Sequence, residues 1–68
     1  AFMKLTINGD TREFDEVCTL SELLKTLGLE GKPVVIELNR EALAPSEFRG
    51  RPLTDDDSLE IITIAAGG

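Results

Sequence analysis

The chain has 68 residues, with 13 acidic and 7 basic side chains and a formal net charge of −6 at pH 7. A surface of that sign repels phosphate backbones and favours partners with basic docking surfaces, so we expect no nucleic-acid binding. So short a chain buries only about 60% of its unfolded surface and contains no histidine, so we expect one small domain without a deep pocket or its own catalytic site.

The sequence also indicates the cellular compartment in which we expect the protein. No apolar run approaches the length of a membrane span or a signal peptide, so we expect no membrane contact. The single cysteine, Cys18, excludes an internal disulfide framework and fits a reducing cytoplasm, and no neighbour in sequence would activate its thiol. Met3 looks like the natural start, so we interpret Ala1 and Phe2 as a vector remnant and residues 3–68 as a single domain.

The first segment predicts a β-hairpin. Residues 3–8 alternate apolar and polar side chains, the pattern of a half-buried strand. Asn8-Gly9 follows and favours a type I′ turn, which requires positive φ at both central positions. Residues 11–17 can then return antiparallel, with Phe14 as their large apolar side chain.

The next segment predicts a helix of about ten residues. Thr19 and Glu22 have the spacing of a capping box, in which each side chain bonds the other's backbone amide. Gly28 stands where a left-handed C-terminal cap is expected. The apolar face follows the i, i+3, i+4, i+7 spacing and consists of Leu20, Leu23, Leu24 and Leu27.

The second half predicts further strands and a short helical turn. Residues 34–39 are rich in β-branched side chains and predict a strand, followed by a turn and a short strand that ends at Leu43. Residues 45–48 predict a brief helical turn with Phe48 buried. Leu53 is expected to anchor the core.

An acidic turn at residues 54–57 precedes the last predicted strand, residues 58–64. Its three adjacent carboxylates point in different directions and lack regular ligand spacing, so we interpret them as a solvated turn and expect no metal site.

These elements predict an α+β fold, a mixed sheet of four to five strands with one main helix on one face. The leucine face of the helix would cover Leu5, Ile7, Ile36, Leu43, Leu59 and Ile61. Alternation along the strands sends other side chains to the opposite face. The resulting apolar patch with acidic flanks is typical of a protein interface, and we expect it to bind a partner through Val35, Glu37, Glu60, Ile62 and Ile64.

The last residues form the most unusual feature of the sequence. Ala65, Ala66, Gly67 and Gly68 follow a strand directly, and no turn follows that would need the freedom of the two glycines. We expect a flexible, thin tail that carries a terminal carboxylate into a narrow site on another protein.

The order of elements and the terminal Gly-Gly resemble the ubiquitin-like β-grasp fold, and in particular the thiamine-biosynthesis sulfur carrier (ThiS) family. The family often has glycine where Asp56 stands and tryptophan where Phe48 stands, and neither departure touches the tail. The resemblance covers almost the whole chain, and its matching segments are residues 3–9, 19–24, 36–39, 45–48 and 57–62, followed by 66–68.

The resemblance implies that the protein is a carrier and not an enzyme. A partner adenylyltransferase of the ubiquitin-activating type would use ATP and Mg²⁺ to adenylate the Gly68 carboxylate. Sulfur from a persulfide donor would then replace the adenylate, leaving a thiocarboxylate (1-thioglycine) at Gly68 and no bound cofactor. Thiazole synthase would take this sulfur into thiamine. The small subunit of molybdopterin synthase and a ubiquitin-like protein modifier stay open as alternatives.

Overall fold

The computed structural model describes residues 2–64, so Ala1 and the predicted tail, residues 65–68, lie outside the described residues. Within this range each predicted element is present, with strand ends shifted by one or two residues. The strands are β1 (Phe2–Ile7), β2 (Asp10–Asp15), β3 (Val34–Leu38), β4 (Glu41–Leu43) and β5 (Ser58–Thr63). The helices are α1 (Leu20–Thr26) and the 3-10 helix η1 (Pro45–Glu47).

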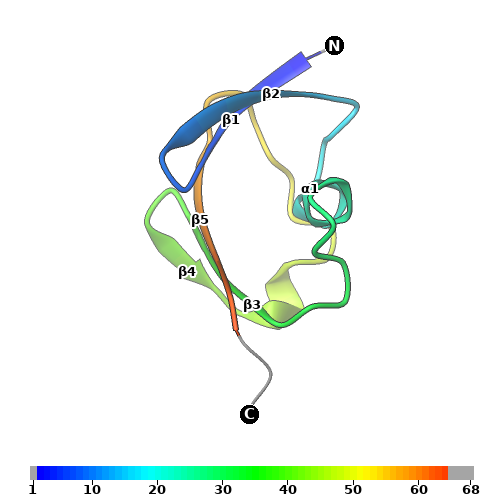
Figure 1. Ribbon diagram of the computed structural model, residues 1–68, viewed down its shortest axis with the longest axis vertical. Coiled ribbons are helices and arrows are strands. Elements are labelled where there is room, and N and C mark those ends of the chain that lie inside the picture. The colour runs from blue at the N-terminus through cyan, green and yellow to red at the C-terminus, as the bar shows by residue number, and fades with distance from the viewer. Residues whose placement is uncertain (1, 65–68) are drawn as a thin grey trace.

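The five strands form one mixed sheet in the order β2-β1-β5-β3-β4. β5 lies at its centre, parallel to β1 and antiparallel to β3, while the two hairpins β1–β2 and β3–β4 are antiparallel. Figure 1 shows α1 on one side of this curved sheet and the end of β5 at the lower end of the molecule. The predicted α+β class, with one main helix on one face of a mixed sheet, is confirmed.

Both hairpins turn through residues with positive φ. Asn8 and Gly9 have φ values of 52° and 83°, so the predicted type I′ geometry is confirmed. Asn39 and Arg40 make the corresponding turn between β3 and β4, with φ values of 50° and 70°. Asparagine tolerates this region better than most side chains because it can hydrogen-bond locally.

The predicted capping box begins α1. The Glu22 amide donates to Thr19 Oγ1 at 3.2 Å, and the Thr19 amide donates to Glu22 Oε1 at 2.9 Å. The amide of Cys18, whose side chain is exposed, donates to the same Glu22 oxygen at 2.9 Å. The bonds from the Cys18 and Thr19 amides hold the pKa of the Glu22 carboxyl below its ordinary value of 4.5.

A glycine cap ends α1 after seven helical residues, so the helix is shorter than predicted. Gly28 has a φ of 75°, and its amide donates to the Lys25 carbonyl at 3.1 Å. The amide of Leu29 reaches back to the Leu24 carbonyl at 2.8 Å. These two bonds are those of a Schellman motif, so the predicted role of Gly28 is confirmed.

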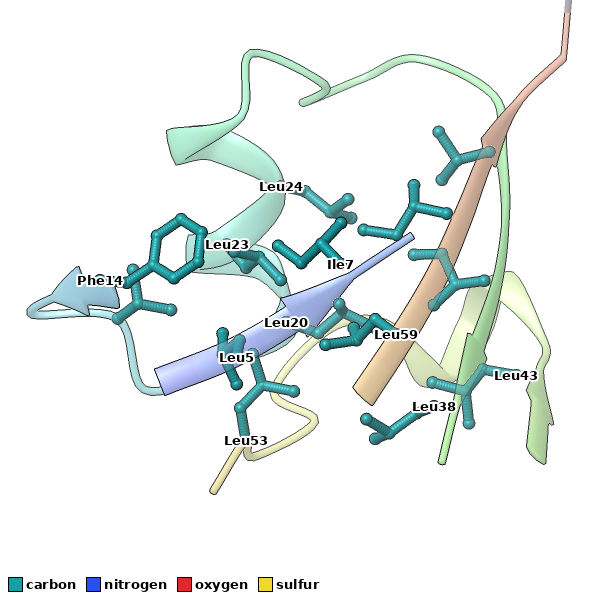
Figure 2. Close-up of a cluster of buried hydrophobic side chains, with 14 residues drawn as sticks. Leu5, Ile7, Phe14, Leu20, Leu23, Leu24, Leu38, Leu43, Leu53 and Leu59 are labelled. Carbon is teal, nitrogen blue, oxygen red and sulfur yellow. The ribbon is translucent and has the colours of Figure 1, made fainter. Parts of the chain in front are cut away.

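The core lies between α1 and the sheet, where the leucines of the helix point toward β1 and β5 (Figure 2). The expected burial of Leu53 and of the strand residues under the helix is confirmed, and Phe14 is buried with them. Phe48 was expected to be buried, but it is only half-buried because it follows η1 at the rim of a surface pocket. The buried apolar residues are Leu5, Ile7, Phe14, Val17, Leu20, Leu23, Leu24, Val34, Ile36, Leu38, Leu43, Leu53, Leu59 and Ile61.

Candidate functional site

β5 is the base from which the C-terminal segment leaves the sheet. It pairs with the full length of β3, from Val34 opposite Thr63 to Leu38 opposite Leu59. The last hydrogen bond before residues 65–68 joins the Ile64 amide to the Pro33 carbonyl at 3.0 Å. The point where the segment begins is therefore fixed to the middle of a five-stranded sheet.

The side chain of Asn8 extends the pairing between β1 and β5. The two strands share only two register pairs, which end at Ile7 and Leu59. Beyond them, Asn8 Nδ2 donates to the Ile61 carbonyl at 3.0 Å, and the Ile61 amide donates to Asn8 Oδ1 at 2.8 Å. The amide side chain thus takes the place of a strand residue. The sequence showed Asn8 only as a turn residue, and no local pattern indicated this second role.

Asn39 makes a similar contact at the start of β5. The Ser58 amide donates to Asn39 Oδ1, and Asn39 Nδ2 donates to Asp57 Oδ1, both at 2.9 Å. Partial burial raises the pKa of the Asp57 carboxyl, but the bonds from Asn39 and from the Thr54 amide outweigh it, so the pKa lies below the ordinary value of 3.8. Asp57 is therefore a structural acceptor.

The carboxylates of the acidic turn, residues 54–57, accept a backbone hydrogen bond and form an ion pair. Asp55 Oδ1 accepts the Lys4 amide at 2.6 Å, and the Lys4 ammonium pairs with Asp56 at 3.4 Å. Within residues 2–64, no group of histidine, cysteine, aspartate or glutamate side chains is arranged to hold a metal ion. The same part of the chain has no helix long and apolar enough to cross a membrane.

The sheet face turned away from α1 carries four of the five residues predicted to bind a partner. Val35 lies opposite Ile62, and Glu37 lies opposite Glu60, on the paired strands β3 and β5. The side chains of Val35 and Ile62 are 48% and 61% exposed. We call these four residues the outer patch. The register thus brings two apolar side chains and two carboxylates together on one exposed surface.

Ile64 has a different setting from the other four. It follows the end of β5, is 51% exposed, and lines a surface pocket of about 690 Å³. The pocket is a depression that is open to solvent. Four segments far apart in sequence make this cationic pocket. Its main lining residues are Lys32, Pro33, Val34, Phe48, Arg49 and Ile64. Sequence reasoning missed Lys32 and Arg49 because each lies in a loop without a motif.

The mixed sheet with one helix and a central last strand defines the molecule as a ubiquitin-like β-grasp domain. It is similar to the crystal structure of the thiamine biosynthesis protein ThiS from Geobacter metallireducens, with a TM-score of 0.79 and 32% sequence identity. The likeness covers 97% of this chain and 100% of that chain. The model of the ThiS family matches residues 5–68. The chain therefore belongs to the ThiS family.

Two relatives are similar to this chain over most of its length, and they differ in size. The sulfur carrier protein ThiS of Thermus thermophilus is 40% identical over 62 residues, which are 91% of this chain and 95% of that protein. A thiazole synthase of Paramagnetospirillum magneticum is 38% identical over 66 residues, which are 97% of this chain. The chain spans only 20% of the length of that thiazole synthase.

Proposed function

We propose that the protein carries sulfur for thiamine thiazole synthesis as a thiocarboxylate on Gly68, and that it acts as a substrate of its partners. The observation that carries this proposal is the ThiS family match, which continues from the folded domain through residue 68. The relatives support the same pathway, since one is named a sulfur carrier and the other a thiazole synthase. These names favour thiamine over the molybdopterin and modifier alternatives.

The chemistry begins with a poor electrophile. A terminal carboxylate has a pKa of about 3.5 and is ionised at neutral pH, so its oxygen is a poor leaving group. An adenylyltransferase of the ubiquitin-activating type joins it to the phosphate of AMP, using ATP and Mg²⁺ and releasing pyrophosphate. AMP then becomes the leaving group for attack at the Gly68 carbonyl carbon.

A persulfide donor supplies the sulfur. Its terminal sulfur attacks the acyl adenylate, which gives an acyl disulfide and releases AMP. A second thiol then breaks the sulfur–sulfur bond, leaving the thiocarboxylate and a new disulfide. We propose that thiazole synthase accepts this sulfur. The carrier needs no general base or bound cofactor of its own, and we place the cycle in the cytoplasm, where free thiols are available.

Residues 65–68 and the outer patch have separate roles in this proposal. The fixed start at β5 sets where residues 65–68 begin, and the missing Cβ atoms of Gly67 and Gly68 let them enter a channel that a side chain would block. Ala65 and Ala66 are the small links between strand and glycines. The outer patch binds the adenylyltransferase through its apolar pair, while the carboxylates of Glu37 and Glu60 meet basic groups on that enzyme.

Intact-mass measurement tests the proposal. The protein is incubated with adenylyltransferase, ATP, Mg²⁺, the persulfide donor and a thiol, and we expect one oxygen to be replaced by sulfur at the C-terminus. The matched variant Gly68→Ala should fold normally but stay unthiolated. Thiolation of Gly68→Ala at the wild-type rate would contradict the steric role of the glycine, and conjugates with other proteins would favour the modifier alternative.

A further inference from the structure

The cationic pocket has a charge opposite to that of the molecule. The chain has 13 acidic residues, yet none of the nine lining residues within 2–64 is acidic, and two of them are Lys32 and Arg49. Both cations are exposed, and neither makes an ion pair with another described residue. Two uncompensated positive charges on an acidic protein create a local site that attracts a carboxylate.

The walls of the pocket are held in place before any partner arrives. Ser21 Oγ of α1 donates to the Phe48 carbonyl at 3.2 Å, which ties the end of η1 to the helix. The Lys32 amide donates to the Leu29 carbonyl at 3.1 Å and closes the loop before β3. Phe48 packs partly against the core. A preformed site loses little conformational entropy when a ligand binds.

The pocket suits a ligand that carries apolar groups as well as a negative charge. Apolar surface comes from Pro33, Val34, Phe48 and Ile64, beside the two cations. The pocket is open to solvent and has a volume of about 690 Å³, so it can take a short segment that lies across it and leaves one side exposed. The chemistry that fits is therefore an apolar peptide segment with a carboxylate beside it.

The position of Ile64 connects this pocket with the C-terminal segment. Ile64 lines the pocket and is the residue directly before 65–68. A partner that binds residues 65–68 therefore comes close to this pocket. Figure 1 shows the end of β5, the start of β3 and η1 gathered at the same end of the molecule.

We infer that the cationic pocket is a docking site for a short apolar, carboxylate-bearing segment of a partner protein that also takes the C-terminal residues. It differs from the outer patch, where Glu37 and Glu60 select basic groups. The two surfaces select opposite charges on either side of the strand that leads to residue 65. This inference does not require that Gly68 is thiolated.

Two matched peptides test this site by NMR titration of the ¹⁵N-labelled protein. The probes are acetyl-Leu-Phe-Glu-amide and acetyl-Leu-Phe-Gln-amide, which differ only in the carboxylate. We expect saturable shifts at the amides of Lys32, Val34 and Ile64, with the glutamate peptide binding about fivefold more tightly, as one exposed ion pair allows.

Two double variants test whether the preference for the glutamate peptide arises in the pocket. Lys32→Gln with Arg49→Gln should bind both peptides equally, whereas Lys25→Gln with Arg40→Gln, which removes the same charge outside the pocket, should keep the preference. All four side chains are exposed, so both variants should retain the native spectrum.

Three results would overturn the inference. The wild-type protein could bind both peptides equally, or the shifts could centre on Val35 and Ile62 in the outer patch. A chain that ends at Ile64 could bind the peptide far more tightly, which would make residues 65–68 the natural occupant. A protein that distinguishes the peptides but is never thiolated would refute the proposed function alone.

Discussion

Among single residues, the strained backbone positions are the hardest to predict from the sequence. The Asn8-Gly9 pair indicated positive φ because both residue types favour it, and the structure agrees. Positive φ at Glu16 and Arg40 could not be foreseen, since these residue types rarely adopt it, whereas aspartate, as at Asp56, adopts it more often. At Asp56 the φ of 71° lies in the left-handed region, which glycine adopts without steric strain.

Replacing Asp56 with glycine should therefore stabilise the fold. Asp56→Gly is compared with Asp56→Ala, because both lose the exposed contact with Lys4 and they differ only in the Cβ atom. We expect the glycine variant to be more stable than the alanine variant by about 1 kcal/mol in urea unfolding. Equal stabilities would mean that the left-handed conformation at residue 56 is not strained.

Among the elements, β5 depends on side chains of the turns as well as on strand pairing. Asn8→Gly would relax the backbone at φ 52° but would remove both bonds from the Asn8 side chain to Ile61. Because two part-buried hydrogen bonds outweigh the relaxed turn, we expect a loss of about 1–2 kcal/mol in the free energy of unfolding. A gain in stability would show that the backbone term dominates.

The capping box of α1 gives the protein an acid-sensitive contribution to stability. Glu22 is bonded by the Cys18 and Thr19 amides as the anion, and its folded pKa lies below 4.5, so folding favours the ionised form. This contribution is complete above the unfolded pKa and is lost as the pH falls through the lower folded pKa. Asp57 acts with the same sign below 3.8.

Urea midpoints between about pH 6 and about pH 3 test this linkage. Glu22→Gln should lose less stability over that interval than the wild type, because glutamine keeps a capping acceptor without titrating. Glu13→Gln, on the edge strand β2, is the matched control for the loss of one exposed carboxylate. A Glu22→Gln curve parallel to the wild type would contradict the role of the carboxylate.

Helix and strand positions could be predicted because each depends on local patterns. Thr19, Glu22 and Gly28 are capping residues at fixed spacings, and alternation placed Ile36 and Ile61 in the core. The bonds from Asn8 to Ile61 join residues 53 positions apart, and no local pattern encodes such a contact. The length of α1 was overestimated because its C-cap residue, Leu27, continues the apolar pattern beyond the last helical residue.

Across the whole molecule, two exposed surfaces flank the strand that leads to the C-terminal segment. The outer patch could be predicted since it follows from period-two alternation in β3 and β5, whereas its binding partner stays a prediction. The cationic pocket could not be predicted because its lining comes from residues 21, 31–34, 45, 48–49 and 64, which meet only in the folded chain.

Substitutions at two adjacent residues, on opposite faces of β5, test whether the outer patch binds the adenylyltransferase. Ile62 is 61% exposed, so Ile62→Asp should change stability by about 1 kcal/mol or less but weaken adenylyltransferase binding about tenfold or more. Ile61 is 6% exposed, so Ile61→Asp should unfold the domain. Calorimetric titration and urea unfolding measure the two effects. Unfolding of Ile62→Asp, or its unchanged affinity, would contradict the assignment.

If Gly68 delivers sulfur to the thiazole ring, labelled sulfur on the protein should move into the thiazole product. The protein is thiolated with isotopically labelled sulfur, purified, and mixed with thiazole synthase and its other substrates. We predict that the label leaves the protein, that an ordinary carboxylate returns at Gly68, and that the label appears in the thiazole product. Label that stays on the protein, or a product without label, would contradict the account.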